Sequence, residues 1–455
     1  MPGWGKQIPK RNIFRALVAG LSTLAILGAA YAAWHGIRQR ARGAELFPAD
    51  GEQEASSTTS IRITFAALPD QSDAAARFSV TPPLEGSLAW EGSALVFRPA
   101  RPLSYGQVYT VTLRDDVSWS FRVGHPRITY LAVDEQERLQ LWVTSAQGGP
   151  PAQLTAGDRD VWDYALHPEG TLIAYSLTRE DEGTDLWQVG RDGSDPRLLL
   201  RCPRAACTAP AWSPDGRQIA YERKDLSETQ IGFLSGPLTP HIWLLDLDSG
   251  ETGPLFADAP TPGHSPLWAP AGRRLAFYDM AEGAVQIYDL DSGQQQFFDT
   301  ISGVGTWDPS GEEMILPDST FHNQASDDYL IRISFTTRQV QKLNTSFAVD
   351  DTLPHWSPTG EWVALGRTGL PDGTPTWGTQ LWLMRPDGSR AQPLVTDKEA
   401  NFGAFAWRSD GGALAYVRLS MEDLADPRPE LWIVDLSDRQ PRLLARDAIM
   451  PDWLP

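Results

Sequence analysis

Aromatic side chains in turn-rich stretches are the first residues of this sequence that suggest binding chemistry. They are Phe233, Phe321, Phe347 and Trp377, and His322 directly follows one of them. Exposed aromatic side chains are frequent anchors of protein interfaces, and their rings also stack on sugars. We predict these five residues as binding residues. The alternative for each aromatic ring is that it packs against its own loop.

Adjacent carboxylates form a second candidate feature. Asp327 and Asp328 are one such pair, and Asp350 and Asp351 are another. Two neighbouring carboxylates can bind a cation or a cationic partner, although charged loop residues are often simply solvated. We predict that Asp350 and Asp351 contribute to binding.

Metal-binding and catalytic motifs are missing from the sequence. The seven histidines show no metal-ligand spacing, and neither a His-Glu-x-x-His nor a Gly-x-Ser-x-Gly motif occurs. The segment Asp246–Glu251 superficially resembles a calcium loop, but it lacks the twelve-residue pattern and recurs at Asp289–Gly293 as turn chemistry. We therefore expect no metal, no cofactor and no catalytic residue, and we predict that the chain is not an enzyme.

Two cysteines, Cys202 and Cys207, are the only ones in the chain. A Cys-x4-Cys pair without further ligands is a poor zinc site. In an exported protein such a pair favours a disulfide, which we predict here. Free thiols are the alternative in a cytosolic protein.

The composition limits the classes of protein that this chain can belong to. A formal net charge of −19 over 455 residues argues against nucleic-acid binding, which requires a basic surface. A hydrophobic content of 41% excludes wholesale disorder. The positive charge is concentrated at the start, because the first 43 residues carry seven Lys and Arg and no carboxylate.

An apolar stretch near the N-terminus predicts a membrane anchor. Ala16–Trp34 is nineteen residues long without a charge, and a helix of this length would rise about 28 Å, close to the ~30 Å hydrocarbon core. We predict a short cytoplasmic tail over residues 1–12 and a transmembrane signal-anchor helix over 13–35. The expected location is the cell membrane, single-pass, with the N-terminus cytoplasmic and most of the chain extracytoplasmic. The alternative is a cleaved signal peptide.

The next segments predict a linker and a small β-domain. We predict a linker over residues 36–57, because the stretch from Gly43 to about Ser60 is small, polar and acidic. From Ile61 the apolar residues recur with period two and are separated by turn residues, which predicts an antiparallel sandwich over 58–125. The pattern from Ser79-Val80-Thr81-Pro82 through Leu95–Pro99 to Tyr109–Leu113 resembles the bacterial Ig-like domain of the SbsA type. The resemblance implies a spacer without site chemistry.

A six-residue motif of the type x-Trp-Ser-Pro-Asp-Gly recurs along residues 126–455. Its six copies, some with substitutions, are Ala165–Gly170, Ala211–Gly216, Leu267–Gly272, Thr306–Gly311, His355–Gly360 and Ala406–Gly411. The copy at Ala165–Gly170 has Leu166 in place of Trp. The Trp positions are spaced by 46, 56, 39, 49 and 51 residues, and a further 46 lead to Trp453. A short apolar strand follows each motif.

Four strands in every 40–50 residues are typical of a propeller blade. The motif resembles the TolB-like, WD-type β-propeller repeat, which implies an all-β fold over 126–455. Counting Trp453 predicts seven blades, with six or eight as alternatives, and a last strand that completes the sheet begun by residues 127–155. Eleven of the 18 Trp residues occupy two recurring blade positions, so most of the Trp excess reflects packing between blades.

Loop lengths indicate which end of the propeller carries function. The turns between first and second strands, and between third and fourth, are short. The connections between second and third strands, and from one blade to the next, are long and irregular, including Lys224–Pro240, Pro317–Asp328 and Thr368–Gln380. Both kinds of long connection lie at the same end of an antiparallel blade. We call this end the loop-bearing face and expect it to bind a partner.

Two functional classes follow from these patterns. The first is a membrane-anchored extracytoplasmic binding or scaffold protein that engages a protein or peptide through its loop-bearing face. The alternative is a cell-envelope carbohydrate-binding protein or glycan-active enzyme, in which the loop aromatics stack on sugar rings. The expected partners are therefore the membrane through residues 13–35, a protein or peptide, and a cell-surface glycan as the alternative, with no nucleic acid.

Overall fold

The computed structural model describes residues 44–113, 117–226, 239–257, 261–300, 303–322, 325–343, 349–370, 372–422 and 427–455. The chain divides into two compact units. The first unit includes Thr59–Val123, and the second includes Gly124–Pro455 together with the short segment Ser56–Thr58. The predicted cytoplasmic tail, residues 1–12, and the predicted transmembrane helix, residues 13–35, lie outside the described residues.

The described residues give no support to the predicted location in the cell membrane. In the part of the chain that the structure describes, no helix is long and apolar enough to span a bilayer. The helix described there, α2 (Gln71–Ala76), has six residues and rises only about 9 Å, against the ~30 Å of a hydrocarbon core.

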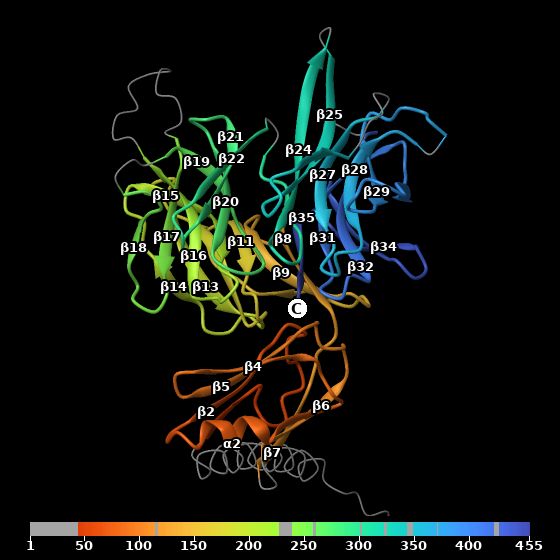
Figure 1. The fold of residues 1–455 in the computed structure, drawn as a ribbon. Coiled ribbons are helices and arrows are strands. Elements are labelled where there is room, and N and C mark those ends of the chain that lie inside the picture. Colours follow the sequence, from red (N-terminus) through yellow and green to blue (C-terminus); the bar gives the residue numbers. More distant parts are fainter. Residues whose placement is uncertain are drawn as a thin grey trace, which may run out of the picture. The chain divides into compact units, whose positions relative to one another are not determined.

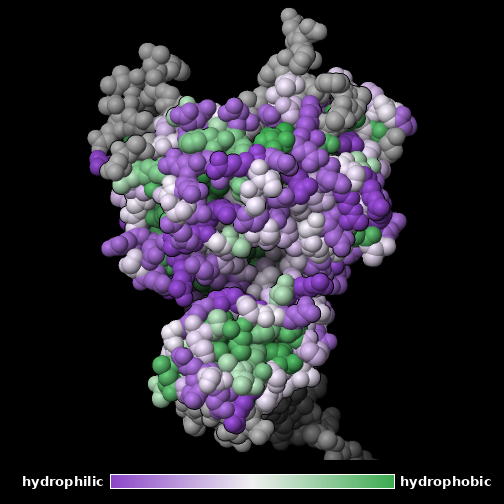
Figure 2. Space-filling view, in the orientation of Figure 1, coloured by the Kyte–Doolittle hydropathy of each residue, from purple (hydrophilic) through white to green (hydrophobic). Residues whose placement is uncertain are grey.

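Two antiparallel sheets form the first unit, in the strand orders β1-β2-β5-β4 and β3-β6-β7. Its strands are β1 (Ala44–Phe47), β2 (Ile61–Phe65), β3 (Phe78–Thr81), β4 (Gly86–Glu91), β5 (Ala94–Pro99), β6 (Val108–Leu113) and β7 (Val117–Arg122). Alternate side chains such as Ile61, Val111 and Trp119 are buried in its core. The predicted small β-sandwich is confirmed. Figure 2 shows hydrophobic side chains on the visible face of this unit.

Strand β1 lies within the segment that the sequence predicts as a linker, residues 36–57. It pairs antiparallel with β2, with Ala44 opposite Phe65 and Phe47 opposite Arg62. The small and acidic composition of this segment hides the strand, because only four residues pair. Helix α2 is also absent from the sequence prediction. Its N-terminus is capped by Asp70, whose carboxylate accepts hydrogen bonds from the N–H groups of Ser72 and Asp73.

Antiparallel sheets follow one another along the second unit (Figure 1). The first is formed by β8 (Arg127–Val133), β9 (Leu139–Ser145), β10 (Ala152–Gln153) and the C-terminal β35 (Ala448–Leu454). The next two are β11 (Val161–Leu166), β12 (Leu172–Thr178), β13 (Thr184–Gly190) and β14 (Arg197–Leu200), then β15 (Ala205–Trp212), β16 (Gln218–Asp225), β17 (His241–Asp246) and β18 (Thr252–Pro254).

The remaining sheets have the same strand order. They are β19 (Gly263–Trp268), β20 (Arg274–Asp279), β21 (Ala284–Asp289) and β22 (Gln295–Asp299), then β23 (Thr306–Trp307), β24 (Glu313–His322), β25 (Ala325–Ser334) and β26 (Val340–Lys342). These are followed by β27 (Asp351–Trp356), β28 (Val363–Thr368), β29 (Thr379–Met384) and β30 (Gln392–Val395), and by β31 (Ala400–Trp407), β32 (Ala413–Ser420), β33 (Glu430–Asp435) and β34 (Pro441–Arg446).

Strand β35 closes the second unit. It pairs with β8, with Ala448 opposite Ala132 and Trp453 opposite Ile128. The last strand therefore completes the sheet begun by the first strands of this unit, as the sequence predicts. The second and third sheets are also joined, because β13 and β15 pair in parallel through Thr184 and Ala206.

The motif tryptophans link neighbouring sheets. In five of the six, all but Trp356, the indole Nε1 donates to the carbonyl oxygen of the residue one before the corresponding motif position in the preceding sheet. The pairs are Trp212 to Ala165, Trp268 to Ala211, Trp307 to Leu267, Trp407 to His355 and Trp453 to Ala406, at 2.9–3.2 Å. The tryptophans therefore both fill the space between sheets and satisfy a carbonyl of the neighbouring inner strand.

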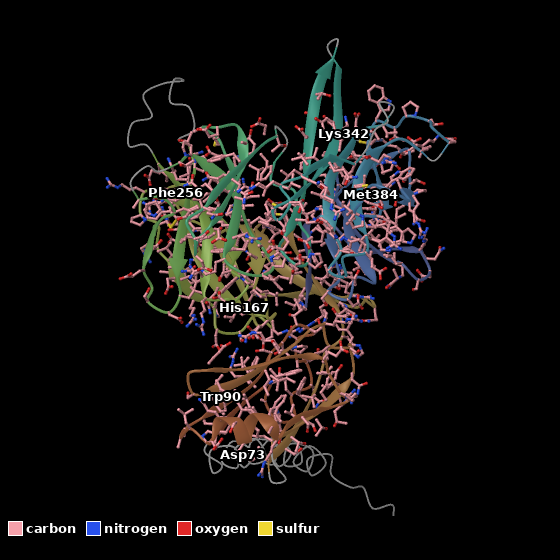
Figure 3. The ribbon with its side chains drawn as sticks, in the orientation of Figure 1. Asp73, Trp90, His167, Phe256, Lys342 and Met384 are labelled. Carbon is pink, nitrogen blue, oxygen red and sulfur yellow. A yellow bond between two sulfur atoms is a disulfide. The ribbon has the colours of Figure 1, made fainter. Side chains whose placement is uncertain are left out.

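Where Leu166 replaces the motif Trp, hydroxyl groups provide the link. The Tyr164 hydroxyl donates to the Met450 carbonyl at 2.6 Å. The Thr129 hydroxyl lies 3.1 Å from both the Tyr164 hydroxyl and the carbonyl oxygen of Asp452. A neighbouring motif position, His167 (Figure 3), packs edge-on against Trp212 with ring centroids 4.7 Å apart. Polar contacts thus replace the indole at the junction between β11 and β35.

Replacing Trp453 by Phe is expected to lower the free energy of unfolding by about 1–3 kcal/mol, because the Ala406 carbonyl loses its donor. Trp356→Phe is the matched control. The Trp356 indole N–H donates to the carbonyl of Gly360 in its own turn, at 3.4 Å. An Arg side chain lies over its ring, as it does for Trp453. Urea denaturation of both variants measures the difference, and an equal loss at the two positions contradicts the linking role.

Candidate functional site

A pocket of about 770 Å³ lies on the loop-bearing face of the second unit. Its walls come from the ends of β11, β12, β15 and β16 and from the connections beside them. These segments belong to the second–third strand connections and the sheet-to-sheet connections. The pocket therefore lies at the end of the sheets where the sequence places variable loops. Its volume is in the usual range for ligand-binding sites.

Two large apolar side chains of the pocket are exposed. Trp162 is 61% exposed and Met280 is 44% exposed. Trp162 owes its position to a β-bulge in β11, where Val161 pairs with Leu177 and Asp163 pairs with Ser176, so that Trp162 has no partner in the ladder. A bulge redirects the side chain of its extra residue. Trp and Met side chains contribute strongly to binding surfaces because they combine large apolar area with adaptable packing.

Paired charges surround these apolar groups. Arg138 lies 3.6 Å from Asp160, and Arg159 lies 2.5 Å from Glu180 and 3.7 Å from Asp158. These side chains are mostly solvent-exposed, so each pair contributes little to stability. These ion pairs neutralise most of the charge at the rim of the pocket.

Three further charged groups of the pocket are less compensated. Lys224 and Glu182 form no ion pair among the described residues. The Glu222 carboxylate accepts a hydrogen bond from the Ser265 N–H at 2.7 Å. A ligand with polar or charged groups can therefore find unpaired partners of either sign.

Two carboxyl groups with raised pKa lie on the neighbouring inner strands β11 and β35. Burial raises the pKa of Asp163, which accepts hydrogen bonds from the Ser176 hydroxyl and the Ala209 N–H. Solvent reaches the Asp452 side chain, but the protein atoms around its carboxyl raise its pKa to about 6. A carboxyl group that titrates near pH 6 can donate or accept a proton near neutral pH.

The Asp452 carboxyl gives a pH-dependent contribution to stability. Its pKa is about 6 in the folded chain and about 3.9 in an unfolded one, so the folded state holds the proton more tightly. The contribution is fully present below about pH 4 and is lost as the pH rises through about 6. We expect Asp452→Asn to gain thermal stability relative to the natural protein between pH 4 and 7. Melting curves across this range test this, and parallel curves for the two proteins contradict it.

The predicted binding residues do not form one cluster. Phe233 and Phe347 lie outside the described residues. Phe321 and His322 are the last residues of β24, where they pair with Ser326 and Ala325 in a long hairpin. The predicted loop over Pro317–Asp328 is therefore wrong for Pro317–His322 and Ala325–Asp328, which lie within β24 and β25.

The predicted acidic pair Asp350 and Asp351 is not a joint site. Asp351 is fully buried and forms two hydrogen bonds with the Arg367 guanidinium, at 2.6 and 2.7 Å. Asp350 is half-buried and accepts hydrogen bonds from the Asp328 N–H and the Thr368 hydroxyl. The reason is strand alternation, which sends adjacent side chains in opposite directions. Within the described residues, no group of three or more His, Cys, Asp or Glu could hold a metal ion.

Trp377 is 95% exposed in the connection between β28 and β29. Its role as a partner anchor stays a prediction. Cys202 and Cys207 are joined by a disulfide and are both fully buried. Their loop leads into β15, which contributes Ala206 and Thr208 to the pocket.

Sequence reasoning missed the pocket itself. Trp162 could have indicated it, because this residue lies outside the two recurring Trp positions of the repeat. Its side chain therefore has no packing role between sheets that would explain it. Its neighbours in the pocket come from connections and strand ends that are far apart in the sequence, and they meet only because consecutive sheets pack against one another.

Comparisons with known proteins cover both units. Residues 44–119 match the family model described as a bacterial Ig-like domain. An uncharacterized protein, Atu1656, from Agrobacterium fabrum is 26% identical over 242 residues, which is 50% of this chain and 78% of that protein. An uncharacterized peptidase, YuxL, from Bacillus subtilis is 28% identical over 79 residues, which is 17% of this chain and 12% of that protein.

Solved structures resemble the chain in fold. An oligogalacturonate lyase from Vibrio parahaemolyticus has a TM-score of 0.50 at 12% identity, covering 79% of this chain and 98% of that one. TolB from Acinetobacter baumannii has a TM-score of 0.43 at 14% identity, covering 83% of each chain. The chain has an all-β, propeller-like fold with TolB among its structural neighbours.

The prediction that the chain is not an enzyme is contradicted. One relative, which matches 79 residues of this chain, is named as a peptidase. The prediction rested on missing motifs, but the lack of a Gly-x-Ser-x-Gly segment excludes one class of serine hydrolase and leaves other chemistries open.

Proposed function

We propose that the second unit is a seven-bladed propeller that binds a peptide segment of a partner protein in the pocket on its loop-bearing face. The observation that carries this proposal is that the exposed side chains of Trp162 and Met280 both line a concave site of about 770 Å³. An exposed aromatic side chain inside a pocket, surrounded by a polar rim, is the usual arrangement of an interface hot spot.

The charges support a peptide more than a purely apolar ligand. The pocket contains both carboxylates and cations, and Lys224 and Glu182 have no ion pair among the described residues. A peptide backbone offers donors and acceptors together, and its side chains offer an apolar group for Trp162. The binding role is compatible with catalysis on the bound segment.

Selection from a random peptide library displayed on phage, using the full chain as bait, tests this function. We expect enriched peptides that carry an apolar residue and bind with micromolar or tighter affinity in calorimetry. Mass spectrometry of each peptide after incubation shows whether it is also cleaved. The proposal fails if no peptide is enriched over a bait-free selection.

A glycan is the second candidate, because an aromatic ring beside carboxylates can also stack on a sugar. A glycan array probed with the same protein separates the two functions. Binding to glycans without any peptide binding would replace the peptide proposal with this alternative.

A further inference from the structure

Arg179 connects the pocket to the disulfide loop. It follows β12, lines the pocket and is 19% exposed. Its guanidinium forms a two-pronged pair with Asp181, with Nε and Nη2 each 2.9 Å from a carboxylate oxygen. Its Nη1 lies 2.6 Å from the carboxylate of Asp185, which is 6% exposed. These contacts hold the guanidinium in one orientation.

The disulfide loop supplies further acceptors to the same guanidinium. Arg179 donates through Nη1 to the carbonyl of Cys202 at 2.7 Å and through Nη2 to the carbonyl of Ala205 at 3.1 Å. The Cys202 N–H donates to Asp185 at 2.7 Å. The loop between the cysteines therefore helps to hold the Arg179 guanidinium in place. Gly183 permits this approach, since a Cβ there would lie 2.1 Å from Arg179 Nη2.

The second cysteine contacts a neighbouring part of the pocket wall. The Thr184 hydroxyl donates to the Cys207 carbonyl at 2.6 Å, and Thr184 pairs with Ala206 across the junction of β13 and β15. Thr184, Ala206 and Thr208 all line the pocket. The disulfide thus lies directly behind the segment that forms one wall.

We infer that ligand binding in this pocket is coupled to the Cys202–Cys207 disulfide, so that reduction of the bond loosens the wall and lowers affinity. This inference rests on the proposed peptide-binding function. Without the covalent link, the loop between the cysteines gains conformational freedom. The carbonyls of Cys202 and Ala205 then no longer hold Arg179 in place.

The reductant is a dithiol. One of its thiolates attacks a sulfur of the disulfide, which forms a mixed disulfide and releases the other cysteine as a thiolate that takes up a proton. The second thiolate of the reductant then closes a cyclic disulfide and releases the remaining cysteine. Two electrons move from the dithiol to the cysteines, and both cysteines end as thiols. Because both sulfurs are buried, the reaction requires local opening of the loop.

Reciprocity provides the sharpest test. If reduction weakens binding, a bound peptide must oppose reduction. We expect dithiothreitol treatment of the full chain to weaken binding of a selected peptide at least 10-fold in calorimetry. A peptide at 100 times its Kd should slow the appearance of free thiols by at least 10-fold, and by about 100-fold if only the open form reacts and that form binds no peptide. Equal affinity in the oxidised and reduced protein would overturn the inference.

The double variant Cys202→Ser/Cys207→Ser is the non-reducible counterpart and should bind as the reduced protein does. Hydrogen exchange at Ala206 and Cys207 is a readout that needs no ligand, and we expect faster exchange after reduction. If no peptide binds even the oxidised protein, the proposed function fails, while this readout still decides whether reduction loosens the pocket wall. Unchanged exchange after complete reduction would overturn the coupling alone.

Discussion

Replacing Arg367 by Met is expected to lower the free energy of unfolding by about 3–5 kcal/mol. The Asp351 side chain is fully buried, and the two hydrogen bonds from the Arg367 guanidinium, which is itself only 13% exposed, balance its charge. Removing the cation leaves a carboxylate that must either stay charged in a poorly solvated site or take up a proton. Urea denaturation followed by Trp fluorescence measures the loss.

Arg332→Met is the matched control for this prediction. Arg332 also pairs across two neighbouring strands, with Glu313, and also lies over a Trp ring. The side chains of Arg332 and Glu313 are each about one quarter exposed. We therefore expect Arg332→Met to lower the free energy of unfolding by about 1 kcal/mol or less. The double variant Asp351→Asn/Arg367→Met should recover much of the stability lost in Arg367→Met. Similar losses of unfolding free energy in Arg367→Met and Arg332→Met would contradict the view that burial of the ion pair decides how much stability is lost.

Replacing Arg179 by Met is expected to have the second large effect, with about 3–5 kcal/mol lost from the free energy of unfolding. The change leaves the buried Asp185 carboxylate without its cation and the carbonyls of Cys202 and Ala205 without their donor. It also removes a side chain that lines the pocket and the contacts that hold the neighbouring disulfide loop, so the affinity for a selected peptide should fall at least 10-fold. Denaturation and calorimetry on the same protein measure both effects.

Arg179→Lys distinguishes geometry from charge. A lysine keeps the positive charge, but it cannot form the forked set of hydrogen bonds that the guanidinium makes with Asp181, Asp185 and the two carbonyls. We expect an intermediate loss of stability and a loss of peptide affinity close to that of Arg179→Met. Full retention of both properties in the lysine variant would contradict the role assigned to the guanidinium.

The repeat was the most predictable feature of the sequence. The motif Trp residues, spaced by the length of one four-stranded sheet, predict the inner strands, and Trp453 predicts that the last strand pairs with β8. This works because each sheet must bury its faces against its neighbours, so the same large side chain recurs at the same place.

The site was less predictable, because it depends on departures from the repeat. Pro317 suggests the end of a strand, yet it lies inside β24 opposite Leu330, where its carbonyl accepts a hydrogen bond from Thr300. Asp351 lies opposite Arg367 on the next strand. This pairing depends on a bulge between Thr352 and His355. Trp162 enters the pocket through another bulge. Bulges change the direction of single side chains, and periodicity does not reveal them.

The pocket and its Trp162 form the central claim, and paired tryptophan variants test it most directly. Calorimetry with one selected peptide should give a Kd about 30-fold higher for Trp162→Ala than for the natural protein, which corresponds to about 2 kcal/mol. Trp377→Ala removes a tryptophan that is even more exposed but lies in the β28–β29 connection, which does not line the pocket, and it should leave the Kd unchanged. A large loss for Trp377→Ala together with normal binding by Trp162→Ala would contradict the account.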